Sequence, residues 1–184
     1  NDPTTWSPSG VPGANDRVVI RSGDVVNYNQ VSDVAINCIG IDGSLIFSNN
    51  INTRLKVGDL QVYDIGYLEV GAESNPISPS VTAEIIIADK ALDTSFDPIQ
   101  YGTGLISLGK VTMHGSEKTG FERLAVEPLN GTTQLVFSKP VRGWKTGDKL
   151  FLPDTRQIDT INVPEYEFPQ VALISGDGRT VTLV

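Results

Sequence analysis

Short runs of alternating apolar and polar residues recur along the whole chain, and no window longer than ten residues keeps a helical apolar rhythm uninterrupted. Glycine, aspartate, asparagine and proline separate these runs and supply turn conformations. The pattern predicts an all-β protein. The expected strands cover residues 18–20, 25–28, 36–41, 44–47, 60–62, 67–70, 83–87, 104–108, 110–113, 133–137, 149–152, 171–174 and 180–183.

A glycine followed by an alternating apolar strand is the repeated unit of this pattern. Gly23, Gly43, Gly66 and Gly109 precede such strands at intervals of 20, 23 and 43 residues, and the apolar run 84–88 lies where the skipped repeat is expected. A period of roughly 22 residues holds two or three short strands with their turns, which is one coil of a parallel β-solenoid.

The later part of the chain is less regular. Further copies of the pattern start at Gly147 and Gly178, and the irregular tracts 72–79, 93–103 and 154–169 are expected to project as loops. A β-sandwich also has strands that recur at short spacing with turns between them. The periodicity therefore favours a parallel β-helix, with a β-sandwich as the alternative, in a single domain that spans residues 1–184.

Composition excludes several classes of function. The 184 residues include one cysteine and one histidine, so neither an internal disulfide nor a zinc site with the usual four nitrogen and sulfur ligands can form. No apolar run approaches the ~18 residues of a membrane-spanning helix. A net charge of −8 repels phosphate backbones. We therefore expect no membrane insertion and no nucleic-acid partner.

An ordered set of motifs carries a resemblance to a known family. Residues 5–13 read TWSPSGVPG, residues 66–71 read GYLEVG, and residues 143–155 read GWKTGDKLFLPDT, after the pair His114-Gly115. This set resembles the G-eight domain family, named for its glycines, over essentially the whole chain. One departure is Phe121, at a place where the family commonly has a tryptophan.

The resemblance implies an extracellular or cell-surface module, usually one part of a larger protein, as in fibrocystin-like proteins. In hyaluronan-degrading relatives the module precedes a right-handed parallel β-helix, so the resemblance favours that fold over the sandwich. Because the last expected strand runs to the end of the sequence, we expect the natural polypeptide to continue. We expect two kinds of partner. One is a glycan or polysaccharide, for which an acidic sugar is one option, and the other is the remainder of the parent polypeptide.

Three residues are candidates for catalysis. His114 is the only histidine, and histidine is the usual general acid or base at neutral pH. The alternative is that His114 bonds to the backbone at the end of a coil. Asp148 follows Gly147 at an expected tight turn, where a carboxylate commonly serves the local backbone instead. Arg123 is the third candidate.

Charge is uneven along the chain. Residues 110–156 contain eight basic and five acidic residues, a net charge of +3, whereas the remainder carries −11. A patch in this region would attract an acidic glycan, and the alternative is a solvated face of mixed sign. The candidate ligand-binding residues are the basic Arg123, Arg142 and Lys145 and the aromatic Trp144, Tyr101 and Tyr166, whose rings either stack on sugars or belong to the core.

Three hypotheses of function follow. The first is an extracellular carbohydrate-associated module that caps or extends a β-helix. The second is the N-terminal part of a polysaccharide-degrading enzyme, hyaluronidase-like or lyase-like, with His114, Arg123 and Asp148 in a cleft that further coils complete. The third is a structural stalk or adhesin element. We expect no catalysis by the isolated chain and no cofactor, although the loops contain carboxylates suited to calcium without EF-hand spacing. These are Asp42, Asp59, Asp64, Asp89, Asp93 and Asp97.

Overall fold

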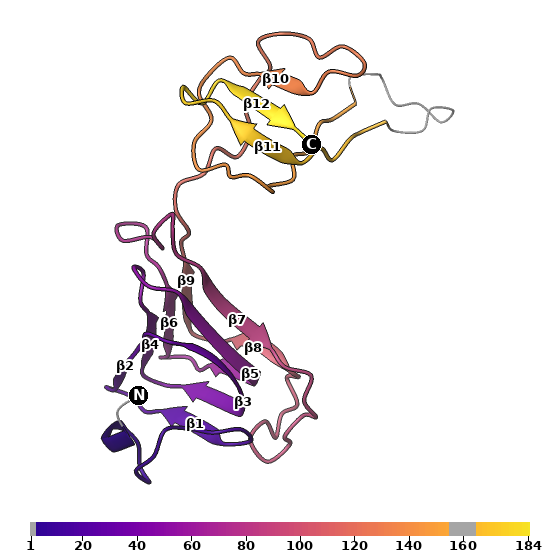
Figure 1. Ribbon diagram of the computed structural model, residues 1–184. Coiled ribbons are helices and arrows are strands. Elements are labelled where there is room, and N and C mark those ends of the chain that lie inside the picture. The colour runs from indigo at the N-terminus through magenta and orange to yellow at the C-terminus, as the bar shows by residue number, and fades with distance from the viewer. Residues whose placement is uncertain (1–2, 155–164) are drawn as a thin grey trace. The chain divides into compact units, whose positions relative to one another are not determined.

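The computed structural model describes residues 3–154 and 165–184, which form strands, turns and one short 3₁₀ helix (Figure 1). The prediction of an all-β protein is confirmed. The elements are η1 (Pro3–Thr5), β1 (Arg17–Ile20), β2 (Val25–Tyr28), β3 (Val31–Ile41), β4 (Ser44–Phe47), β5 (Thr53–Val62), β6 (Tyr67–Val70), β7 (Ala83–Ile87), β8 (Gly104–Ser107), β9 (Lys110–Met113), β10 (Gln134–Val136), β11 (Val171–Ile174) and β12 (Thr180–Leu183).

The chain folds as two units, Asn1–Ser116 and Glu117–Val184. Most of the loop predicted at 154–169 lies outside the described residues, as does Arg156, one of the eight basic residues counted above. Each unit has its own cluster of buried apolar side chains.

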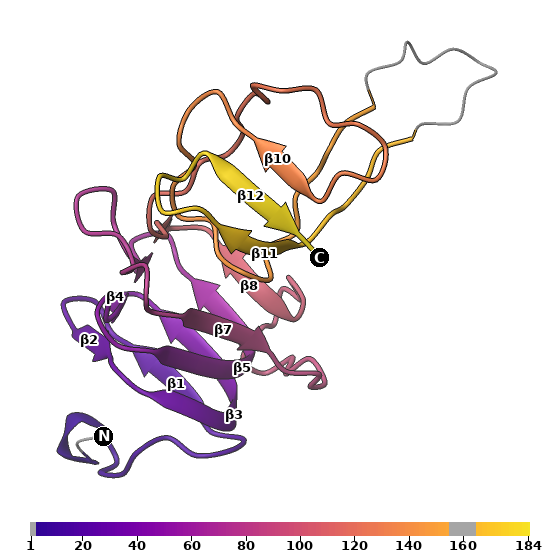
Figure 2. The same ribbon diagram turned by 45° about the horizontal axis from the view of Figure 1, so that its top comes forward.

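Parallel pairing organises the first unit. One sheet has the order β1-β3-β5-β7, with β8 also paired to β5, and the other has the order β2-β4-β6-β9 (Figures 1 and 2). From β1 to β6, consecutive strands of the chain alternate between the two sheets. Each turn of the chain therefore adds one strand to each sheet.

Apolar side chains occupy equivalent positions in successive strands and build the core of the first unit. Their backbones lie side by side in the parallel registers, so the side chains form rows that run across the sheets. Burial of each such side chain contributes about 1.5–3 kcal/mol. Two of the rows are Val18, Ile39 and Leu60 in the first sheet, which the exposed Leu105 extends, and Val26, Leu45, Leu68 and Val111 in the second.

The repeated glycines lie where one turn of the chain packs on the turn before it. A Cβ atom added at Gly43, Gly66 or Gly109 would overlap a backbone carbonyl oxygen of the preceding turn. These oxygens belong to Arg21, Ile41 and Tyr63, respectively. Only glycine leaves room for this approach, because any other residue would displace backbone. The regular glycine spacing thus reflects steric need at each corner.

Hydrogen bonds join the same corners. The residue after each glycine donates its N–H to the preceding corner: Ser44 to Asp24 O at 2.9 Å, Tyr67 to Gly43 O at 2.9 Å and Lys110 to Gly66 O at 3.0 Å. Gly23, in the first copy of the repeat, has no atom within 4 Å of its added Cβ and adopts a φ of +88° instead. The close contact therefore begins only when a second turn stacks on the first.

The second unit is an antiparallel sheet with the order β10-β12-β11, packed on a small cluster of buried apolar residues. The predicted continuation of the repeat from Gly147 and Gly178 is wrong. Residues 149–152 form only isolated bridges, and β12 pairs antiparallel with both neighbours. The repeat does not continue at Gly178 because this residue, with a φ of +71°, closes a tight turn in which its N–H donates to Ser175 O at 2.8 Å. This turn makes a hairpin rather than a stacked corner.

We predict that Gly66→Ala lowers the free energy of unfolding by about 1–3 kcal/mol, because the added methyl group overpacks the corner. Denaturant unfolding measures this loss. Gly115→Ala is the matched control, because Gly115 has open space around its added Cβ and no left-handed φ. The control should change stability by less than about 0.5 kcal/mol. Equal effects of the two substitutions would contradict the stacking argument.

Candidate functional site

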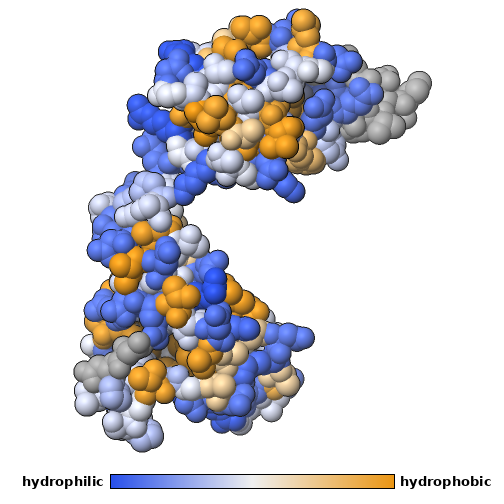
Figure 3. Space-filling model, in the orientation of Figure 1, coloured by the Kyte–Doolittle hydropathy of each residue, from blue (hydrophilic) through white to orange (hydrophobic). Residues whose placement is uncertain are grey.

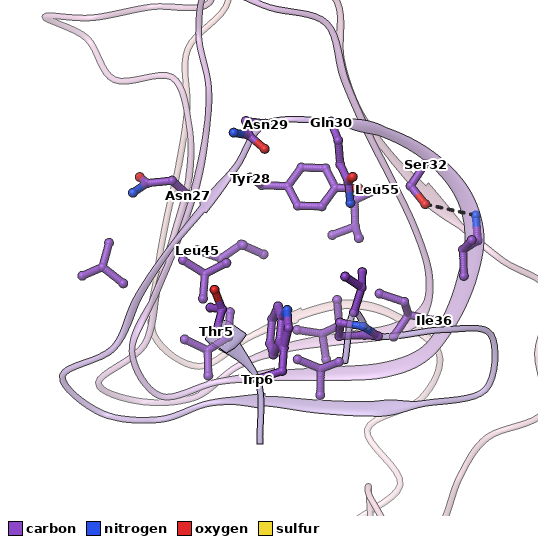
Figure 4. A pocket seen from close by; sticks show the side chains of 18 residues that line it. Thr5, Trp6, Asn27, Tyr28, Asn29, Gln30, Ser32, Ile36, Leu45 and Leu55 are labelled. Atoms are coloured by element: carbon purple, nitrogen blue, oxygen red, sulfur yellow. Dashed lines mark hydrogen bonds between the residues drawn. The ribbon is translucent and has the colours of Figure 1, made fainter. Parts of the chain in front are cut away.

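A cavity of about 600 Å³ opens in the first unit, at the β1 and β2 end of the stacked strands (Figure 4). Trp6 and Tyr28 approach it from opposite sides, and Leu45 and Leu55 are among the apolar residues that line it. Tyr28 Oη donates to Arg54 O at 2.6 Å, and burial raises the pKa of Tyr28 to about 12. None of the described residues that line this cavity is charged, so it offers apolar contact and neutral hydrogen-bonding groups only.

A larger cavity, of about 820 Å³, lies in the second unit. We call it the basic cavity, because Lys118, Arg123 and Lys149 line it together with two acidic residues, Glu122 and Asp148. Leu135, Phe137 and Trp144 from the buried cluster line it as well. The cavity thus brings together three of the residues singled out in the sequence, Arg123, Trp144 and Asp148. Figure 3 shows apolar areas beside hydrophilic ones on the surface of this unit.

Trp144 is a fixed wall of the basic cavity. Its indole Nε1 donates to Thr119 O at 2.6 Å, and its ring packs edge-on against Phe137 with the centroids 5.3 Å apart. The residue is half-buried. The sequence left open whether the Trp144 ring stacks on a sugar or belongs to the core. In the structure the ring lies at the edge of the core and also lines the cavity, and its N–H is already bonded to Thr119.

Asp148 is held as an ion and as a local backbone acceptor. Its Oδ2 accepts from Lys118 Nζ at 2.6 Å and from Lys145 N at 2.8 Å. The hydrogen bond from Lys118, with that from the Lys145 backbone, lowers the pKa of the Asp148 carboxyl. Asp148 N also donates to Lys145 O at 3.0 Å, which closes the turn. A carboxylate in this setting orients Lys118 and stabilises the turn, which agrees with the alternative that Asp148 serves the local backbone.

Within the described residues, Arg123 and Lys149 are the cations of the cavity that form no ion pair with a carboxylate, whereas Lys118 is paired with Asp148. The Arg123 backbone is fixed, because Arg123 N donates to Glu122 Oε1 and Arg123 O accepts from Ser138 N, both at 2.8 Å. In the part of the chain that the structure describes, the Arg123 guanidinium takes part in no ion pair. Its planar fork is therefore available to a ligand that carries a carboxylate or a sulfate.

Three exposed aromatic rings form a cluster that touches the basic cavity. Phe151 lines the cavity and lies 5.6 Å, between ring centroids, from both Tyr166 and Phe168, which are 5.5 Å from each other. A backbone bridge between Leu152 and Glu167 brings the two segments together. Tyr166, a predicted sugar platform, therefore lies beside the cavity through Phe151.

The remaining candidates do not line the basic cavity. His114 and Tyr101 belong to the first unit, where His114 N donates to Val70 O at 3.0 Å and His114 O accepts from Ile77 N at 2.9 Å. These bonds join main-chain atoms, so the role of the His114 imidazole stays a prediction. Arg142 N donates to Thr119 Oγ1 at 2.8 Å, and Lys145 contacts a residue of the cavity through its backbone N–H, which donates to Asp148 Oδ2.

Carboxylates of the first unit have other surroundings. Asp93 pairs with Arg17 at 2.6 Å, and Asp59 is buried and accepts from Gln61 Nε2 at 2.8 Å. Burial raises the pKa of Asp59. Within residues 3–154 and 165–184, no three His, Cys, Asp or Glu side chains come together as ligands for a metal ion.

Sequence comparison identifies the family. The model of the G8 domain matches residues 5–125. The chain belongs to the G8 domain family. The predicted resemblance is therefore confirmed. Mouse (Mus musculus) Fibrocystin-L is 25% identical over 183 residues, which is 98% of this chain and 4% of the relative. No solved structure matches.

The G8 match includes the whole first unit from Thr5 onward and ends at Ala125. Arg123 thus lies inside the matched residues, whereas Trp144, Asp148 and Phe151 lie beyond them and within the stretch similar to Fibrocystin-L. In the described part of the chain, no helix is long and apolar enough to cross a membrane.

Sequence reasoning did not single out Lys118 and Phe151 as site residues. Phe151 belongs to the GWKTGDKLFLPDT segment, and Lys118 was counted only in the charge balance. Lys118 lies between Glu117 and Thr119, and Phe151 lies between Leu150 and Leu152, so neither residue differs enough from its neighbours to stand out in the sequence. The bond to Asp148 and the bridge at Leu152 place them at the cavity.

We predict that Asp148→Asn destabilises the protein by about 1 kcal/mol at pH 7, because it removes a partly exposed ion pair and a charged backbone acceptor. The lowered pKa of Asp148 makes this contribution present above the unfolded value of about 3.9 and lost as the pH falls below it. Urea unfolding at pH 7 and pH 3, followed by tryptophan fluorescence, measures the difference. A loss of equal size at both pH values would refute the role of the carboxylate.

Proposed function

We propose that this chain is an extracellular carbohydrate-binding module and that the basic cavity receives an acidic glycan. One observation carries the proposal: in a single cavity, an aromatic and aliphatic wall meets an arginine that forms no ion pair among residues 3–154 and 165–184. Sugar-binding sites need apolar surface for the C–H faces of the rings and a few directed polar groups for orientation. Arg123 supplies a bidentate donor for the acidic group, and Lys149 adds positive charge.

The volume and composition of the cavity support this proposal. About 820 Å³ falls within the range of small-molecule sites, which is roughly 300–1,000 Å³. The chain as a whole is acidic, so an acidic ligand is drawn to this local patch rather than to the average surface. Membership of the G8 family supports an extracellular or cell-surface location, because that is the location implied by the resemblance.

We also infer that the first unit is a right-handed parallel β-helix. Parallel pairing of equivalent strands and the glycine corners support this fold over a sandwich of antiparallel sheets. Right-handedness follows from the rule that about 98% of parallel crossover connections have that hand. The cavity at the end of the stacked strands offers apolar side chains to a further coil, which supports a module that caps or extends the β-helix of a larger protein.

The catalytic and purely structural alternatives have less support. Arg123 and Asp148 line one cavity, but His114 belongs to the first unit. Asp148 is bound to Lys118, and its lowered pKa suits an ion-pair partner rather than a general acid at neutral pH. A passive stalk does not need an unpaired arginine beside an aromatic wall.

Calorimetric titration tests the proposed function with polygalacturonate as the acidic polysaccharide and fully methyl-esterified polygalacturonate as its neutral counterpart. We expect the acidic form alone to bind, and we expect the affinity to fall with added salt. Arg123→Ala should weaken binding by about 10- to 100-fold, the equivalent of a lost charged hydrogen bond of about 1.5–3 kcal/mol.

Lys139→Ala is the matched control, because Lys139 is an exposed cation that does not line the cavity. It should leave the affinity within about twofold. A panel of carboxylated and sulfated polysaccharides extends the test. The proposed function would be refuted if no polysaccharide of the panel bound, or if the Arg123 and Lys139 variants lost affinity equally.

A further inference from the structure

Three aromatic side chains, Phe151, Tyr166 and Phe168, form an exposed cluster that we call the aromatic platform. Each ring is more than half exposed, at 60%, 51% and 61%, although the three are in mutual contact. Contact among the rings restricts their rotation, so a ligand that stacks on them would lose little additional side-chain entropy. A cluster of apolar rings that remains open to solvent marks an interaction site.

Phe151 makes the platform continuous with the basic cavity. It is the one platform residue that also lines the cavity, together with Arg123 and Trp144. We infer that the two form adjacent subsites for one oligosaccharide, with an acid-bearing ring beside Arg123 in the cavity and a neutral ring on the platform. This inference rests on the proposed function and deepens it, because it gives the ligand a minimum length and a charge pattern.

The charges favour this assignment of rings. Three cations, Lys118, Arg123 and Lys149, line the cavity with two carboxylates, Glu122 and Asp148, and leave it net positive, whereas no platform residue is charged. An acidic group therefore gains charged hydrogen bonds in the cavity and none on the platform. The platform suits the C–H face of an uncharged ring, which contacts aromatic side chains without losing hydrogen bonds to water.

An anionic lipid surface fits the platform less well. Glu165 and Glu167 alternate with the platform rings along the same segment, and both are exposed. Their charge repels anionic headgroups at the place where the rings would insert. A glycan that joins the platform to a basic cavity meets no such conflict, because its acidic group lies at Arg123.

Because the two rings belong to one molecule, the affinity should depend on the length of the ligand. Once the acidic ring occupies the cavity, the neutral ring binds its subsite as an intramolecular event at high effective concentration. The probes are glucuronic acid alone and glucuronic acid carried on one, two or three neutral xylose residues. Affinity should rise on the order of 100-fold when the first neutral rings are added, and then level off.

Two variants separate the subsites in the same titrations. Phe168→Ala should keep the affinity for free glucuronic acid and reduce the gain from added rings to about threefold or less. Arg123→Ala should lower the affinity for every probe by a common factor. Leu173→Ala is the matched control for the platform, because Leu173 is an exposed apolar residue outside it. In this variant the affinity should rise with probe length as it does in the unaltered protein. Thermal unfolding of each variant checks that the fold is kept.

The outcomes distinguish the inference from the proposed function. Binding that is equally strong for all probe lengths, or a gain that persists in Phe168→Ala, overturns the platform subsite and leaves an acidic-glycan cavity. Absence of binding by all probes and by the polysaccharide panel overturns both. Vesicles of anionic phospholipid are a further probe, and platform-dependent binding to them would assign the platform to a membrane surface instead.

Discussion

Close approach of backbone to backbone at the glycine corners is the constraint on which the first unit depends. Gly43, Gly66 and Gly109 have no room for a side chain, because each faces a carbonyl oxygen of the preceding turn. The N–H after each glycine bonds to the preceding corner, which sets successive strands side by side. Aliphatic side chains in equivalent positions then meet in rows and form the core. A bulkier residue at a corner would disturb both the hydrogen bonds and the rows at once.

The two units differ in how they use their apolar side chains. The first buries its apolar rows between two parallel sheets and presents only neutral groups in its cavity. The second has a small core, and the residues that extend from it line the basic cavity. Trp144 links these roles, since it packs on Phe137 and faces the cavity with its N–H bonded to Thr119. Such anchoring holds the Trp144 side chain in one position, which would lower the entropic cost of binding the ligand proposed above.

Much of the fold could be predicted from the sequence, because glycine spacing and alternation report local steric needs. The first halves of β3 and β5 were missed, because no glycine directly precedes Val31 or Thr53 to mark a repeat, although Leu55 and Val57 alternate with Arg54 and Lys56 as strand residues do. Arg54 pairs with Asp33 and Glu84 from other strands. Gly178 was misassigned because a glycine that supplies a left-handed turn looks the same in sequence as one that supplies space. Arg123, Trp144 and Asp148 were candidates through local charge and motif, but in two separate sets, and only the structure brings the three to one cavity. Phe151 required the bridge between segments 15 residues apart, at Leu152 and Glu167, which no local pattern encodes.

A crystal structure of the chain bound to glucuronic acid carried on two xylose residues tests the central claim most directly. We expect the carboxylate to lie within hydrogen-bonding distance of the Arg123 guanidinium, with a xylose ring stacked on Phe151 and Phe168. Trp144 should keep its bond to Thr119, because that wall is formed before the ligand binds. A ligand bound instead in the neutral cavity of the first unit, between Trp6 and Tyr28, would contradict the account.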